Sequence, residues 1–475
     1  MATLYTNQDT LPRWTVKPED LPSGSRDPLG FQRYAAHFAE KILPNLTVLT
    51  YRARYYANLA WMLDEIASAY DIRFSAGEML PFEEYNEIVA RFERFLAFAE
   101  AVQHRNDRSG CAWVGMRRSR SLVRGGRSNL PLDVSLTVQE GTNGALANYR
   151  PSMLKIGLLS EAPGMLPDTL TDKGRKLADK FRRAVQMSKA GRASELCRKL
   201  DRRSVSVQEL EGIGKQMCLS MVGDQECQLL NPDLLGDKHE ALVAELRDML
   251  RKRCAPTEGE ILKSYLQSAA QSGKAFELKQ IAIYQAFAVA CLGLFKGLLS
   301  AFGEIGPERQ LDDILSAQLK SENIQPSLTL NKLARGVEGW DEIESLCKQP
   351  NDWSSEPAEW IGPALRLLAW LADRLEKEPA LALSEPVVSV SLPGVTSLMR
   401  PANRPVQQVV EKLCEQLVYD HRQVFLSKAK QPWLNLNGSC LRLEDDTDLL
   451  LGFPPNSVRL GSLISIFRDL EVRNV

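Results

Sequence analysis

The chain has 475 residues and a formal net charge of −1, and it is 44% hydrophobic and 25% charged. These are ordinary globular values, and they exclude a disordered tail protein, a collagen-like fibre and a small disulfide scaffold. A chain of this length is expected to divide into roughly three compact units.

The numbers and spacings of cysteine and histidine limit the disulfide bonds and metal sites that the chain could form. The nine cysteines form no C-x-x-C pair and are odd in number, which argues against a secreted disulfide framework. None of the four histidines lies at metal-ligand spacing from a cysteine, so we expect no metal and no cofactor. The segment 281–302 is apolar enough to span a bilayer, but Gln285 and Lys296 lie within it. We expect a buried helix in a cytoplasmic protein that does not contact a membrane.

Helical periodicity dominates the first hundred residues. Residues 1–26 are polar and contain three prolines, which predicts an extended arm and no signal peptide. Two helices are predicted between 27 and 70, and a third over 82–102 with Phe92, Phe95 and Phe98 in its apolar stripe. Periodicity is then lost from 103 to 131, where arginine, serine and glycine predict an exposed loop.

The most recognisable local pattern follows this segment. A helix is predicted over 144–159, with Gly157 placed to end it in a left-handed conformation. A turn-rich stretch then leads to a new helix that starts at Leu170 and is capped by Thr171 or Asp172. The sequence "IGLL", a turn and "LTDKGRKLA" together resemble the second half of a winged-helix domain.

The second half of the chain reads as helices with a short β-prone part near the end. Helices are predicted from 190 to 300, with the helix 275–302 at the centre of a bundle, and at several places between 311 and 377. Val387 to Val395 is β-prone, a helix covers 404–426, and 433–443 alternates as two short strands around Asn437 and Gly438. A helix over 457–470 closes the chain.

We therefore predict a mainly α fold, a multi-helix bundle with a winged-helix-like basic segment and a small C-terminal α/β unit that resembles a second winged helix. The expected divisions are the arm over 1–26, a helical and winged-helix-like basic domain over 27–185, a central helical bundle over 186–378 and the α/β unit over 379–475.

The near-zero net charge conceals a strong asymmetry. Residues 101–203 hold 21 Lys and Arg against nine Asp and Glu, so this segment carries +12 and the remainder −13. Such a basic segment on a neutral chain favours a polyanion, and arginine fits phosphate oxygens in a bidentate manner. The candidate nucleic-acid-binding residues are Arg105, Arg108, Arg117, Arg118, Arg120, Arg124, Arg127, Arg150, Lys155, Lys173, Arg175, Lys176, Arg182 and Arg183.

Motifs for catalysis are not evident. There is no G-x-x-x-x-G-K-[ST] phosphate loop and no G-x-S-x-G elbow. A nuclease-like trace of Asp233 with Glu277 and Lys279 needs adjacent strands, whereas Glu277 and Lys279 begin a predicted helix. We therefore expect a non-catalytic protein. Two alternatives stay open: a scaffold whose basic face docks on an acidic partner, and a nuclease-type enzyme with a non-obvious site.

Three stretches carry a resemblance to a wider group. The opening 27–63, the segment around "YRPSMLKIGLL" and "LTDKGRKLA", and the closing "VRLGSLISIFRDLEV" resemble poorly characterised bacterial proteins of multi-gene anti-phage defence clusters. The resemblance implies a DNA-binding, adaptor or sensor subunit that works beside a nuclease, helicase or ATPase encoded elsewhere. The expected partners are therefore other protein subunits and DNA, as a duplex rather than a single strand.

Overall fold

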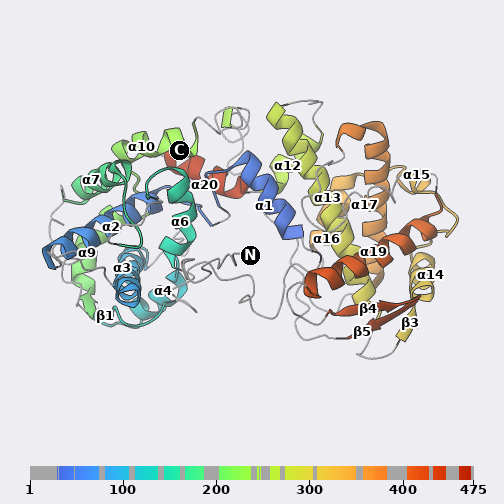
Figure 1. The fold of residues 1–475 in the computed structure, drawn as a ribbon, viewed down its shortest axis with the longest axis horizontal. Coiled ribbons are helices and arrows are strands. Elements are labelled where there is room, and N and C mark those ends of the chain that lie inside the picture. Colours follow the sequence, from blue (N-terminus) through green and yellow to red (C-terminus); the bar gives the residue numbers. More distant parts are fainter. Residues whose placement is uncertain are drawn as a thin grey trace, which may run out of the picture. The chain divides into compact units, whose positions relative to one another are not determined.

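A computed structural model represents the chain, and it shows a mainly helical protein with two small antiparallel sheets (Figure 1). The mainly α class predicted from periodicity is thereby confirmed. The described residues are 29, 31–47, 49–73, 81–105, 113–136, 144–160, 166–186, 203–236, 243–244, 247, 257–267, 273–302, 308–348, 357–381, 404–426, 432–444 and 459–471. The predicted arm over 1–26 and the β-prone stretch 387–395 lie outside these residues.

Two compact units make up the chain, and each is built from separate stretches of sequence. Unit 1 comprises the described residues between Leu43 and Ala255 together with those from Arg459 onward. Unit 2 comprises the described residues up to Ile42 and those between Pro256 and Val458. The expected segment 186–378 is thus cut within its length, because the helix Val207–Met217 packs on Phe82–Gln103 in unit 1, whereas the helix Gly273–Ser300 packs on Phe31–Ile42 and Pro357–Lys377 in unit 2.

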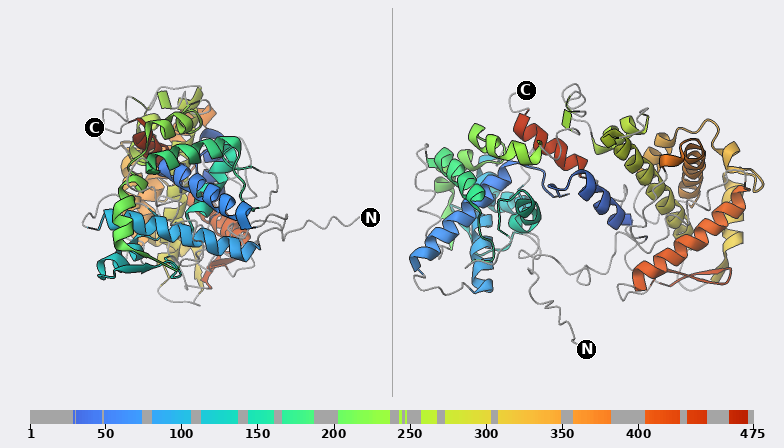
Figure 2. Two further views of the ribbon diagram at one scale, coloured as in Figure 1. Left: turned by 90° about the vertical axis from the view of Figure 1, so that its left-hand side faces the viewer. Right: turned by 45° about the horizontal axis from the view of Figure 1, so that its top comes forward.

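Unit 1 is an assembly of helices around the two long helices α2 and α3, which contact each other (Figure 2, left). Its elements are α2 (Arg54–Arg73), α3 (Phe82–Gln103), α4 (Met116–Arg124), β1 (Asn129–Pro131), α6 (Ala145–Lys155), α7 (Asp172–Gln186), β2 (Ser204–Ser206), α9 (Val207–Met217), α10 (Asp224–Leu234) and α20 (Leu460–Glu471). The phenylalanine stripe predicted for α3 is buried. Trp61 of α2 packs against Phe92 and Phe181 and fills the space between α2, α3 and α7.

The connection between α6 and α7 has the local geometry that its glycine predicts. Gly157 has φ +70°, its N–H donates to the Leu154 carbonyl at 3.0 Å, and the N–H of Leu158 donates to the Met153 carbonyl at 2.8 Å. These bonds are those of a helix end with a left-handed residue. Leu159 then forms an antiparallel bridge with Leu170, and Thr171 caps α7 by accepting from the Gly174 N–H at 3.1 Å.

The arginine-rich segment corrects one expectation, because part of the predicted loop 103–131 is a helix. Met116, Ser119 and Val123 of α4 are buried, and their spacing of three and four residues is that of a helix face. The flanking glycines, Gly115 with φ +79° and Gly126 with φ +73°, separate α4 from its neighbours. The many arginines conceal this short apolar stripe in the sequence.

Unit 2 is a helical bundle with a three-stranded sheet of order β3-β5-β4. Its elements are α1 (Phe31–Ile42), α12 (Glu258–Leu266), α13 (Gly273–Ser300), β3 (Glu308–Gln310), α14 (Leu311–Ser321), α15 (Leu330–Leu333), α16 (Gly339–Lys348), α17 (Pro357–Lys377), η3 (Pro379–Leu381), α19 (Val406–Leu426), β4 (Leu434–Asn437) and β5 (Cys440–Leu443). The predicted hairpin around Gly438 forms as β4 and β5, which pair antiparallel. Gly438 has φ +61°, which a tight hairpin turn requires.

The long helix α13 lies inside this bundle, next to α17 (Figure 2, right). Residues Ala275–Ser300 are long and apolar enough to cross a membrane by length and composition, and 94% of the apolar window is buried within the protein. The burial expected from the sequence is confirmed. Lys296 places its ammonium group 3.8 Å from the ring centroid of Trp360, which offsets part of the cost of burying the charge.

The C-terminal residues do not form the separate α/β unit expected over 379–475. The hairpin pairs with β3, which comes from residues 308–310, and so belongs to the bundle of unit 2. The last helix, α20, belongs to unit 1 and packs on α10. Its apolar face explains the placement, since Leu460, Leu463 and Phe467 are completely buried there.

Candidate nucleic-acid interface

Helix α4 presents two chemically different faces in unit 1. Its inner face buries Met116, Ser119 and Val123, and Trp113, just before the helix, stacks on Tyr55 with ring centroids 4.3 Å apart. The outer face carries Arg117, Arg118, Ser121 and Arg124, all exposed. The anchoring of one side by the core therefore directs these arginines outward.

The outer arginines of α4 are free of acidic partners within the described part of the chain. Arg117, Arg118 and Arg127 form no ion pair with another described residue, and Arg127 follows the helix in an exposed position. Arg124 donates from Nε and Nη2 to the Arg105 carbonyl, at 3.3 Å for each atom. The first turn of α4 contains no acidic residue, and no side chain caps it. We call Arg117, Arg118, Arg124 and Arg127 the α4 arginine face.

Arg120 differs from these four, because it is half-buried. Its Nε and Nη2 atoms are buried and have no hydrogen-bond partner within the described part of the chain. Buried guanidinium donors are nearly always paired in folded proteins. Arg120 is therefore not counted with the α4 arginine face, because these two donors are closed to an acceptor from solution.

Three of the predicted residues are instead occupied inside unit 1. Arg150 pairs with the buried Asp168 at 2.6 Å. Lys173 pairs with Asp233 at 2.5 Å and also donates to the Ile156 carbonyl at 2.8 Å. Arg182 is 20% exposed and bridges to α2 through Asp64 and Glu65 while also pairing with Asp179. These cations are neutralised by neighbouring carboxylates and serve the packing of α6, α7 and α10.

The remaining predicted residues are not part of the α4 arginine face, although the Arg105 carbonyl accepts from Arg124. Arg105 pairs with Glu211 at 2.9 Å and Arg175 with Asp172 at 2.8 Å, both as exposed pairs. The Arg175 hydrogen bond and charge lower the pKa of Asp172 below its ordinary value. Lys155, Lys176 and Arg183 are exposed on α6 and α7, and Arg108 lies outside the described residues.

The single basic segment of the sequence therefore becomes two surfaces. Helix α4 packs against α3, whereas α7 packs against α2, α9 and α10. In Figure 1, α7 lies on the upper side of the α2–α3 pair and α4 on the lower side. On α7 the exposed lysines and arginines alternate with Asp172 and Asp179, so the α7 surface is mixed in charge.

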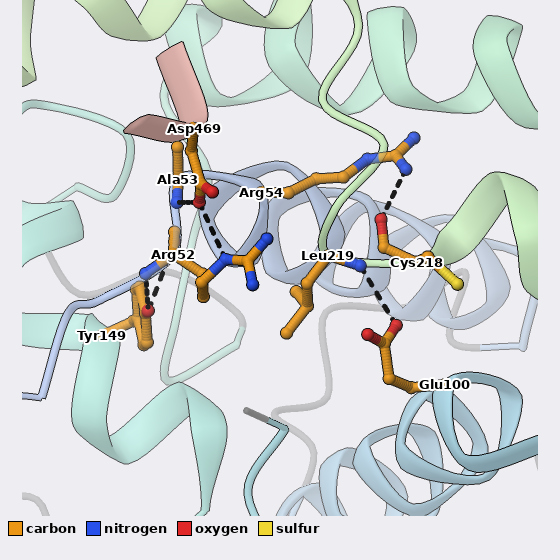
Figure 3. A network of polar contacts seen from close by, with 8 residues as sticks. All are labelled: Arg52, Ala53, Arg54, Glu100, Tyr149, Cys218, Leu219 and Asp469. Atoms are coloured by element: carbon orange, nitrogen blue, oxygen red, sulfur yellow. Dashed lines mark hydrogen bonds and ion pairs between the residues drawn. The ribbon is translucent and has the colours of Figure 1, made fainter. Parts of the chain in front are cut away.

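A polar network at the centre of unit 1 was not predicted from the sequence (Figure 3). Asp469 of α20 accepts from Arg52 Nε at 3.0 Å and from the Ala53 N–H at 2.8 Å. Burial raises the pKa of Asp469, and Arg52 opposes this rise. Arg54 donates to the Cys218 carbonyl at 2.6 Å. These contacts join residues far apart in the chain, and local sequence patterns carry no signal for them.

Two of the three residues with a nuclease-like pattern in the sequence, Asp233 and Lys279, form ion pairs. Asp233 pairs with Lys173 at 2.5 Å within unit 1. Lys279 pairs with Glu378 at 2.6 Å within unit 2, and it lies on α13 with Glu277. These residues come from helices rather than from the adjacent strands that a two-carboxylate metal site requires.

No protein-family model, no curated protein and no solved structure matches this chain. The resemblance to proteins of defence clusters, and the likeness of the α6–α7 region to a winged helix, therefore stay predictions. The assignment of a binding surface therefore rests on the side chains described above.

Proposed function

We propose that this protein binds the phosphate backbone of duplex DNA through the α4 arginine face. The observation that carries the proposal is the contrast within one basic segment: Arg150, Lys173 and Arg182 are neutralised internally, whereas the α4 arginines face outward without acidic partners among the described residues. Exposed like charges in one place repel each other, and a bound polyanion would remove this repulsion and release counterions.

The spacing of the arginines suits a repeating anion. Arg117 and Arg124 are seven residues apart on one helix face, which separates their Cα atoms by about 10 Å at 1.5 Å per residue. Arginine side chains extend this reach, and each guanidinium can grip two oxygens of one phosphate. The uncapped first turn adds the positive end of the helix dipole next to Arg117 and Arg118.

The winged-helix-like region supplies a second, weaker contact in this proposal. The arrangement of α6, the Leu159–Leu170 bridge and α7 is compatible with a helix and a short wing. Lys176 and Arg183 lie on the exposed side of α7, but Asp172 and Asp179 share that side. We therefore assign the larger share of the binding free energy to α4, with backbone contact rather than base reading as its mode.

The protein's role in the cell is proposed from the sequence resemblance alone. A chain that binds DNA without catalysing a reaction would act as an adaptor or sensor subunit of a multi-protein bacterial defence complex. The catalytic step would then belong to a nuclease, helicase or ATPase on another chain.

Fluorescence anisotropy with a labelled duplex of several helical turns tests DNA binding, starting at about 50 mM salt, where phosphate contacts are strong. The variant Arg117→Ala/Arg118→Ala/Arg124→Ala/Arg127→Ala should bind at least about 10-fold more weakly and show a salt slope smaller by about 3 to 4, since each phosphate contact contributes about 0.9. The matched control removes four exposed cations of unit 2, as Lys320→Ala/Lys332→Ala/Arg335→Ala/Arg422→Ala, and should keep the wild-type affinity.

Two results would overturn the proposal. One is the absence of any anisotropy change with duplex or single-stranded DNA at low salt. The other is an equal loss of affinity in the α4 variant and the unit 2 control, because binding would then follow total charge rather than the α4 arginine face. Competition by polyglutamate as effective as that by unlabelled duplex would favour the scaffold alternative, in which this face meets an acidic protein.

A further inference from the structure

Three side chains with metal-binding atoms converge where α3 ends. Glu100 lies in the last turn of α3, His104 follows that helix directly, and Cys218 follows the end of α9. The ligand atoms of the three residues all lie within 4.8 Å of one another. Glu100 and His104 are four residues apart and so share one helix face, whereas Cys218 comes from more than a hundred residues later in the sequence.

Close packing of α9 on α3 produces this convergence. A Cβ atom at Gly214 would lie 2.8 Å from the Ala99 carbonyl oxygen and 2.7 Å from Gln103 Cγ, so only glycine fits there. Gly214 is one turn before Cys218, and its carbonyl accepts from the Cys218 thiol at 3.2 Å. The glycine thus lets the end of α9 approach the end of α3.

The carboxylate of Glu100 is oriented as a ligand would be. Its Oε2 atom accepts from the Leu219 N–H at 3.0 Å (Figure 3), and its Oε1 atom lies 3.8 Å from His104 Nε2. The Cys218 backbone is held from the other side by Arg54, whose Nη1 atom donates to its carbonyl at 2.6 Å. Hydrogen bonds that orient ligand side chains in this way are a regular feature of metal sites.

The imidazole of His104 is an independent indication of a bound metal ion. Its Nε2 atom is buried and has no hydrogen-bond partner among the residues that the structure describes, and the distance to Glu100 is too long for a hydrogen bond. A buried polar atom without a partner calls for an explanation, and an ion is one of the recurring ones. The atom faces a carboxylate and a thiol, which are the two other common ligand types for zinc.

From this geometry we propose that Glu100, His104 and Cys218 bind Zn²⁺. Zinc takes nitrogen, sulfur and carboxylate oxygen at about 2.0 to 2.3 Å, usually with four ligands. A thiolate and a carboxylate would neutralise the charge of the ion. The site also lies at the carboxyl ends of α3 and α9, where helix dipoles favour a cation.

Three protein ligands leave one coordination position. Glu100 and Cys218 are buried, whereas the His104 side chain is 23% exposed, so the fourth position would open on the histidine side. A water molecule or an incoming ligand would occupy it. The ion would cross-link α3 with α9, and it does not depend on the proposed DNA binding.

The test is zinc binding by the full-length protein. Purified protein is stripped with a chelator, dialysed against Zn²⁺ and analysed for bound metal, and its affinity is measured against a chromophoric chelator. We expect one tightly bound zinc per chain. Because loss of an outer-shell partner alone costs about 10- to 100-fold in metal affinity, loss of a ligand should cost at least about 100-fold. The ligand variants are Cys218→Ser and His104→Gln.

The control is Cys227→Ser, which changes another buried cysteine of unit 1 and should keep wild-type zinc affinity. His104→Gln alters a partly exposed side chain, so it guards against a Cys218→Ser variant that fails to fold. Cobalt adds a direct readout: Co²⁺ should give a thiolate charge-transfer band in the wild type and in Cys227→Ser but not in Cys218→Ser. Wild-type protein without bound zinc, or unchanged zinc affinity in His104→Gln, overturns the proposal.

Discussion

Arg54 Nε lies 3.3 Å from the carboxylate of Glu226, and the two side chains are only 2% and 1% exposed. This pair joins α2 to α10 in the interior of unit 1, and Arg54 also donates to the Cys218 carbonyl. Two charges without water require each other, because removal of one leaves the other unpaired in a medium of low dielectric constant.

Glu226→Gln should therefore lower the free energy of unfolding of unit 1 by about 3 to 5 kcal/mol. The double variant Arg54→Met/Glu226→Leu should lose less than Glu226→Gln, since it leaves no buried charge behind. Urea titrations followed by circular dichroism measure both. A single variant as stable as the wild type would mean that water reaches this pair.

The sequence predicted those parts of the fold that local patterns control. Gly157 ends α6 as expected, because a left-handed residue after a helix favours glycine and the turn lies within five residues of chain. The buried stripe of Phe92, Phe95 and Phe98 follows from helical periodicity. The hairpin at Gly438 follows from its turn residues.

Other features depend on partners distant in the chain. The mixing of arginines with Met116, Ser119 and Val123 obscured α4, whose inner face becomes evident only against α3. The proposed zinc site needs Cys218 to meet Glu100, and spacing along the sequence argued against any metal. Likewise, the basic count over 101–203 does not distinguish Arg182, which is neutralised, from Arg117, which is exposed.

The two glycines of α9 should respond in opposite directions to alanine. Gly212 is exposed and a Cβ atom there meets nothing within 4 Å, so Gly212→Ala should stabilise unit 1 by about 0.5 to 1 kcal/mol. Gly214→Ala should destabilise it by about 1 to 3 kcal/mol, because its Cβ atom would overlap the Ala99 carbonyl. Thermal unfolding of both variants measures the difference. Equal shifts would show that α9 does not pack as closely on α3 as described.

Asp420 should make the stability of unit 2 dependent on pH. Burial raises the pKa of this carboxyl group to about 6, although Gln416 Nε2 donates to it at 2.9 Å. An unfolded aspartate has a pKa of about 3.9. The folded state therefore retains the proton to higher pH, so the stabilisation is complete below about pH 4 and is lost as the pH rises through about 6.

Asp420→Asn imitates the protonated group at every pH. The variant should match the wild type near pH 4 and exceed its free energy of unfolding above about pH 7, by on the order of 2 kcal/mol. Urea midpoints of both proteins across this range give the comparison. A constant difference between them at all pH values would contradict the assignment to Asp420.

Arg182 and Arg183 are neighbours on α7 with different predicted roles. Arg182 holds α7 to α2 through Asp64 and the 1% exposed Glu65, which also accepts from Trp61 Nε1 at 3.1 Å. Arg182→Ala should cost about 1.5 to 3 kcal/mol of stability, the range for hydrogen bonds to charged groups, because Glu65 would lose its cation. Arg183 is exposed, so Arg183→Ala should change stability by no more than about 0.5 kcal/mol.

Substitutions of Arg182 and Arg183 should affect the affinity for DNA less than substitutions in the α4 arginine face. At a temperature where Arg182→Ala remains folded, its affinity for duplex DNA and its salt slope should equal those of the wild type, since Arg182 is already neutralised by carboxylates. Arg183→Ala should weaken binding slightly, by less than the loss of any α4 arginine. If Arg182→Ala instead reduced the salt slope by about 0.9, as expected for one phosphate contact, the guanidinium would have to leave Asp64 and Glu65 to meet DNA, which would contradict its assignment as a neutralised residue.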